Sequence, residues 1–90
     1  MYSLKDALYA ASVLGVTFDR FTPEEFLDGI LIELEHGVVS PETNVTNNDL
    51  IVTAKIALAH LNEFPNYYNP DYGLRVFERY LQSRLWIESV

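Results

Sequence analysis

Two histidine–glutamate pairs are the residues in this chain best suited to chemistry. Glu33 and His36 lie three apart in LIELEHG, and His60 and Glu63 show the same spacing in reverse order in LAHLNEF. Residues three apart on a helix share one face, so each pair could offer two ligands to one ion. An antiparallel arrangement of the two helices could bring the pairs together, with Glu35 as a substitute ligand. Such a site would suit one divalent transition metal, so a metal-binding protein or small metalloenzyme is our alternative hypothesis.

A structural role for the histidines is the stronger interpretation. Each histidine lies in the last turn of a predicted helix, where a cation or a donor to the free carbonyls stabilises the helix by about 0.3–1 kcal/mol. Helical bundles that bind two metals also take one Glu from each of two further helices. The first predicted helix offers only Asp6 near its start, and the last offers Glu78 and Glu88 on or near its flanks. We therefore expect no resident cofactor.

Other common sources of catalysis are missing from the sequence. The chain has no cysteine, its serines lie in no activating context, and it has no glycine-rich phosphate loop. We therefore expect that the protein is not an enzyme.

The composition predicts one globular domain that spans residues 1–90. Hydrophobic residues make up 49% of the chain, too many for a disordered segment. A chain of this length buries roughly 60% of the surface that its unfolded form exposes. No apolar run is long enough for a membrane span, and residues 1–10 do not resemble a secretory signal. We expect a soluble, cytoplasmic protein with no membrane partner.

The charge of the chain is acidic and unevenly distributed. Residues 1–63 carry 10 acidic and 3 basic side chains, a net charge of -7, whereas residues 64–90 carry three of each. Nucleic-acid binding needs cationic side chains that displace counterions, so we expect no nucleic-acid partner. The acidic part and the neutral part of the chain are expected to face different partners.

Capping signals predict the first two of four helices. The first helix is predicted over about residues 3–14 and has an apolar stripe along one face. Ser3 can cap its start, and Gly15 lies just past its end. Thr22-Pro23-Glu24-Glu25 is a capping box with proline at the first helical position, and we expect this helix to end at about His36, before Gly37.

The remaining helices are predicted over residues 48–63 and 70–88. Residues 37–47 are a polar loop, and the segment 48–63 is apolar nearly all round, which is typical of a buried helix. Asn69-Pro70 is expected to start the last helix. The predicted fold is an all-α, compact, four-helix bundle-like domain around the central helix 48–63.

Seven of the 12 aromatic residues lie in the last 27 positions. Tyrosine, tryptophan and arginine are enriched at binding hot spots, whereas phenylalanine at helical spacing is typical of a core. We expect Phe64, Phe77 and Tyr80 to be buried. The predicted interaction surface consists of Tyr67, Tyr68, Tyr72, Arg84 and Trp86.

Two stretches resemble a family of small uncharacterised proteins of bacteria and tailed phages. These are the helix end ELEHG with the loop PETNVTNND, and the segment KIALAHLNEFPNYY; together they cover about residues 22–68, and the similarity ends after Tyr68. That family has no assigned activity, so the resemblance implies no reaction. It implies a phage-associated protein in the host cytoplasm or the virion, and a role for Glu35, His36, His60 and Glu63.

The sequence therefore predicts a non-enzymatic protein-interaction module. Its partner is expected to be another protein or a second copy, bound through the aromatic last helix to give a homo-oligomer.

Overall fold

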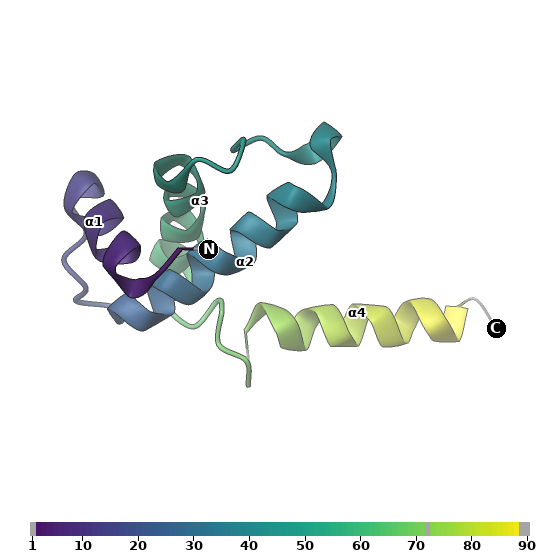
Figure 1. The fold of residues 1–90 in the computed structure, drawn as a ribbon. Helices are drawn as coiled ribbons and strands as arrows, with labels where there is room; N and C mark the ends of the chain where they lie inside the picture. Colours follow the sequence, from purple (N-terminus) through teal and green to yellow (C-terminus); the bar gives the residue numbers. More distant parts are fainter. Residues whose placement is uncertain (1, 72, 89–90) are drawn as a thin grey trace.

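The computed structural model describes residues 2–71 and 73–88, with only the backbone of residues 86–88. It contains four α-helices and one short 3₁₀ helix, and no strand occurs among the described residues (Figure 1). None of the described helices is both long and apolar enough to cross a membrane. The all-α class is therefore confirmed. The elements are α1 (Leu4–Leu14), α2 (Pro23–Val39), η1 (Pro41–Thr43), α3 (Leu50–Glu63) and α4 (Leu74–Glu88).

Helices α1, α2 and α3 pack together as a three-helix body, which we define as residues 2–63. α3 contacts both α1 and α2, as expected for the segment 48–63. It is not buried all round, because Val52 on its outer side is exposed. An aromatic cluster of Phe18, Phe21 and Phe26 fills one side of the core, with ring centroids 5.9–6.0 Å apart. Small alanines allow the helices to approach closely; the buried ones are Ala7, Ala10, Ala11, Ala54 and Ala57.

The predicted helix starts are confirmed where a capping box marks them. The hydroxyl of Thr22 accepts a hydrogen bond from the Glu25 N–H, and the Glu25 carboxylate accepts one from the Thr22 N–H, both at 3.1 Å. The Ser3 N–H likewise donates to the Asp6 carboxylate at 2.8 Å. Gly15 ends α1 in the left-handed region, with φ of 72°.

Three predicted helix ends are wrong by two to four residues. α2 continues through Gly37 to Val39, because Gly37 serves close packing instead of termination: a Cβ there would lie 3.0 Å from the Asn44 side-chain oxygen. α3 begins at Leu50, capped by Asp49, and not at residue 48. α4 begins at Leu74 and not at residue 70, because the Asn69 side chain accepts a hydrogen bond from the Asp71 N–H and forms a turn.

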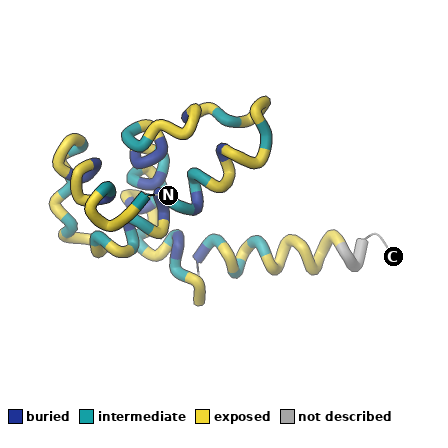
Figure 2. Tube along the Cα trace, in the orientation of Figure 1, coloured by how far each residue is buried: buried dark blue, intermediate teal, exposed yellow. Residues whose placement is uncertain are grey.

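α4 extends away from the body, as Figure 1 shows and as burial along the chain confirms (Figure 2). Among the described residues, α4 makes no helix–helix packing with α1, α2 or α3. The radius of gyration is 14.3 Å, whereas a compact chain of this length has about 12 Å. The described residues form four α-helices, as predicted, but only α1, α2 and α3 pack together as a bundle. Phe77 and Tyr80, expected in the core, are 66% and 60% exposed.

Candidate functional site

The five candidate metal ligands do not gather at one place. In Figure 1, α2 rises to one side and α3 descends across it, so the last turns of the two helices lie apart. Each histidine lies in the last turn of its helix, and the two are therefore not brought together, contrary to the expectation. No group of three or more His, Cys, Asp or Glu side chains in the described part of the chain could hold a metal ion. Metal binding stays a prediction without a preformed site to support it.

Glu33 and His60 contact the same pair of tyrosines, Tyr67 and Tyr68, whereas His36 lies apart from them. His36 is exposed, whereas His60 is partly buried and packs edge-on against Tyr67, with ring centroids 4.3 Å apart. The Glu33 carboxylate accepts a hydrogen bond of 2.7 Å from the Tyr68 hydroxyl. Glu35 and Glu63 are exposed.

Tyr68 anchors the segment that leads from α3 to α4, whose described residues 64–71 and 73 we call the joint. Its side chain is only 4% exposed, so its predicted place on an interaction surface is wrong. The ring lies against α2 at Gly29, where a Cβ would come within 2.6 Å of the Tyr68 ring. Burial, and secondly the hydrogen bond to Glu33, raise the pKa of Tyr68 above its usual 10.0. Tyr68 is therefore a neutral hydrogen-bond donor at physiological pH.

Tyr67 covers the same site from the outside and is partly buried. Burial, followed by the negative charges of Glu33, Glu78 and Glu63, raises the pKa of Tyr67. Its ring lies edge-on to the Tyr68 ring at 4.9 Å. Because both tyrosines hold their protons, the arrangement of His60, Tyr67, Tyr68 and Glu33 is suited to fixing the joint on the body.

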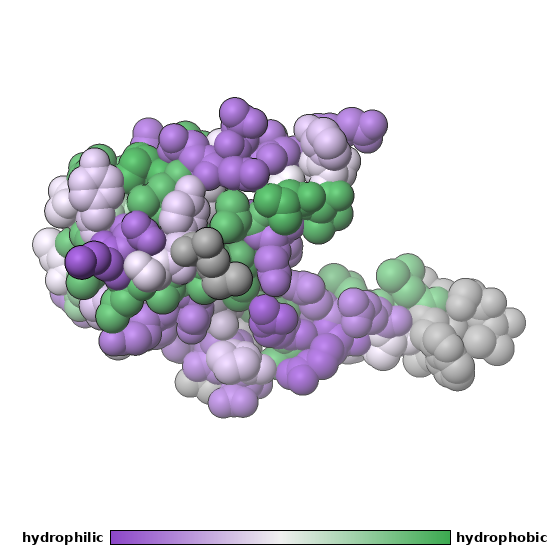
Figure 3. Space-filling view, viewed as in Figure 1, coloured by the Kyte–Doolittle hydropathy of each residue, from purple (hydrophilic) through white to green (hydrophobic). Residues whose placement is uncertain are grey.

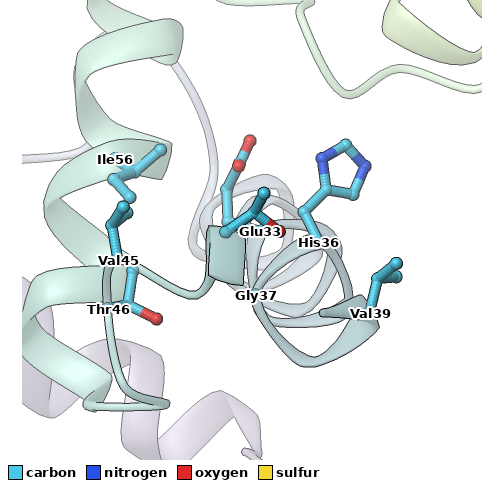
Figure 4. A pocket seen from close by; sticks show the side chains of 8 residues that line it. Glu33, His36, Gly37, Val39, Val45, Thr46 and Ile56 are labelled. Carbon is cyan, nitrogen blue, oxygen red and sulfur yellow. The ribbon is translucent and has the colours of Figure 1, made fainter. Parts of the chain in front are cut away.

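A groove of about 480 Å³ opens at the far end of α2 (Figure 4). Glu33 and His36 line it from α2, and Ile56 lines it from α3, but His60 does not. Figure 3 shows hydrophobic surface towards the end of α2. Three valines of this region are strongly exposed. They are Val38, Val39 and Val45.

α4 carries four exposed large apolar side chains, as many as α1, but each of those on α4 is at least 58% exposed, whereas those on α1 range from 37% to 61%. Phe77, Leu81 and Leu85 are four residues apart and therefore share one face, and their side chains are 66%, 58% and 65% exposed. Tyr80 borders this face and is also exposed. We call these four residues the α4 stripe. At the start of α4, Phe77 and Phe64 line a groove of about 500 Å³, which we call the root groove. Phe64 is itself exposed, contrary to the expected core position.

The predicted interaction surface therefore coincides only partly with this face. Arg84 is exposed on α4, and Tyr67 borders the root groove. Tyr72 and the side chain of Trp86 lie outside the described residues.

A family model described as "Protein of unknown function (DUF5661)" matches residues 7–78. The chain belongs to this family. No curated protein and no solved structure gives a match. The DUF5661 match starts in α1 and ends at Glu78, so it is wider than the resemblance over residues 22–68. Its end leaves three residues of the α4 stripe, Tyr80, Leu81 and Leu85, outside the matched range.

Sequence reasoning placed self-association on the last helix but missed two features of this DUF5661 protein, the close contact at Gly29 and the exposure of Phe77 and Tyr80. Gly29 makes room for the Tyr68 ring, and its only signal is a glycine inside an apolar helical pattern. The α4 stripe has the spacing of a core face, and its only contrary signal is Arg84, which falls among the apolar positions.

Proposed function

We propose that this chain is a non-enzymatic protein-interaction module whose contact element is α4. The observation that carries the proposal is the α4 stripe, four large side chains that are each at least 58% exposed on a helix that does not pack on the body. Contiguous exposed apolar surface of this kind is typical of protein-binding sites. An association with tailed phages is part of the proposal and depends on the sequence resemblance alone.

The marginal stability of an unpartnered helix supports this proposal. α4 has 15 residues, and helices of about 12–15 residues without tertiary contacts are only marginally stable in water. A partner that covers the stripe would supply the missing contacts. Recognition of an amphipathic helix through apolar anchors spaced three or four residues apart is a common mode of protein binding.

The joint supports the proposal because it presents α4 in a defined direction. The Tyr67 N–H donates to the Phe64 carbonyl at 2.9 Å, and the Gly73 N–H donates to the Asn69 carbonyl at 2.8 Å. A Cβ at Gly73 would overlap the carbonyl oxygens of Tyr67 and Asn66, so this turn is closely packed. A fixed presentation lowers the entropy lost when a partner binds.

Site-specific photo-crosslinking in the source cells tests the proposal. A photoreactive phenylalanine analogue at Leu81 is expected to give discrete protein adducts, and the same analogue at exposed Val13 on α1 is the matched control. We expect a second substitution, Phe77→Glu, to abolish the adducts while the helical content of the body is unchanged. Adducts that are equally abundant from position 13, or that survive Phe77→Glu, would contradict the proposal.

A further inference from the structure

We propose that the α4 stripe binds a second copy of this chain, so that two α4 helices pair antiparallel around Leu81. This inference deepens the proposed function by naming the partner, and it therefore depends on that function. It starts from three observations: the exposed stripe, the direction of α4, and the distribution of charge.

The joint prevents α4 from covering the body of its own chain. Tyr68 is buried against α2, and its hydroxyl is bound to Glu33. The Leu74 N–H donates to the Tyr67 carbonyl, and the Arg79 guanidinium donates to the Pro70 carbonyl at 3.4 Å. Folding α4 back would break this set of contacts. The stripe is therefore available to another molecule.

The charge distribution favours a contact between α4 helices over a contact between bodies. Residues 1–63 have a net charge of -7, so two bodies repel one another. α4 carries Arg75, Arg79 and Arg84 against Glu78 and Glu88 and is nearly neutral. It is the surface on which two copies can meet without opposing their acidic parts.

The same repulsion selects the antiparallel direction. A helix of 15 residues is about 22 Å long, and an antiparallel pair places the two bodies at opposite ends of that length. This separation exceeds two Debye lengths at physiological salt, about 8 Å each. A parallel pair would set the two acidic bodies side by side.

An antiparallel pair centred near Leu81 is self-complementary. Leu85 of one copy then lies level with Phe77 of the other, because each is four residues from the centre. That position is beside the root groove, which Phe64 and Phe77 line. Tyr80 and Arg84 border the same edge of the helix, so Arg84 of one copy comes close to Tyr80 of the other, where a cation–π contact can form. The twofold symmetry closes the assembly as a dimer.

Cysteine crosslinking gives a direct test because the full chain contains no cysteine. Under mild oxidation we expect Leu81→Cys to form a disulfide with itself across the twofold axis. Leu85→Cys alone is expected to stay reduced, and a mixture of Leu85→Cys and Phe77→Cys chains is expected to crosslink. Val39→Cys, at the exposed end of α2, is the matched control and is expected not to crosslink. Self-crosslinking of Leu85→Cys would show a parallel pair and overturn the inference.

Sedimentation equilibrium of the full chain provides the second readout. We expect a reversible dimer whose dissociation constant rises at least about 30-fold in Leu81→Glu. Val39→Glu is expected to leave the dissociation constant unchanged. Salt added above the physiological concentration should also change it little, because the antiparallel pair already holds the acidic bodies more than two Debye lengths apart. A chain that stays monomeric at millimolar concentration would overturn the inference, as would a dimer that Val39→Glu disrupts.

The two proposals can fail separately. If the chain is monomeric but a photoreactive group at position 81 still captures another protein in a Phe77-dependent way, the inference fails and the proposed function stands. If neither contact forms, both proposals fail.

Discussion

Phe26 and Phe77 carry the same side chain in opposite surroundings. Phe26 is fully buried between Phe18 and Phe21 in the three-helix body, whereas Phe77 is 66% exposed on α4. Both lie on helices with apolar residues at helical spacing, so the pattern alone does not separate a core face from an exposed face. What separates them is the connection: a loop of eight residues lets α2 pack on α1, while the anchored joint directs α4 away from the body.

The largest expected effect comes from removing one phenylalanine from each region. Phe26→Ala should lower the free energy of unfolding by about 3–5 kcal/mol, because it leaves a cavity in the body. Phe77→Ala should change it by less than about 0.5 kcal/mol when the protein is dilute, because its ring touches little of its own chain. Urea unfolding followed by circular dichroism measures both. Equal losses would contradict the division of the molecule into a body and a projecting helix.

Gly29→Ala tests how the joint is attached to the body. The new methyl group would lie 2.6 Å from the Tyr68 ring, so the ring must shift, and we expect a loss of about 1–3 kcal/mol in urea unfolding. In a Tyr68→Leu background the clash is relieved, and the same substitution should cost much less. If Gly29→Ala is equally costly in both backgrounds, the close contact with Tyr68 is not the cause.

Tyr68→Phe tests the hydrogen bond to Glu33 and its dependence on pH. At neutral pH we expect a loss of about 1 kcal/mol, because the partly buried Glu33 carboxylate loses a donor. The pKa of Tyr68 is raised in the folded state, so its contribution to stability is complete below the usual value of 10.0. Above that pH the unfolded chain releases the proton and stability falls.

The Tyr68→Phe variant lacks this proton and should lose less stability as the pH rises. The stability difference between the variant and the unsubstituted chain should therefore narrow from about pH 9 to about pH 11, which chemical unfolding at each pH measures. If the stability difference between the two proteins widens over this pH range, the pKa of Tyr68 is not raised in the folded state.

The smallest expected effect concerns metals. His36 and His60 lie in separate surroundings, so addition of zinc, iron or manganese should leave the melting temperature unchanged in calorimetry. The matched controls are His36→Ala and His60→Ala. A stoichiometric increase in melting temperature that either substitution abolishes would show a metal site formed by rearrangement of the described side chains.

Local signals in the sequence predict the elements well where the chemistry is local. Thr22 and Glu25 bind each other's backbone N–H across one helical turn, so the start of α2 can be read without knowledge of the fold. Gly37 could not be assigned this way, because its role depends on how the following loop brings Asn44 back against it. The burial of Tyr68 depends on Gly29, which lies 39 residues earlier in the chain.

The candidate site depends still more on long-range packing. The spacing of Glu33, His36, His60 and Glu63 is compatible with a metal site, but the packing of α2 and α3 gathers no three of these side chains at one place. The exposure of the α4 stripe likewise follows from the direction of the joint, which its sequence NYYNPDYG does not specify.

Hydrogen exchange at two protein concentrations tests most directly whether α4 is contact surface and not core. In dilute protein we expect the amides of residues 77–85 to exchange quickly, and those of α2 and α3 to exchange only by global unfolding. At high concentration the α4 amides should become protected as the second copy covers them. If the α4 amides are as protected as those of α3 at every concentration, α4 packs on its own body and the account is wrong.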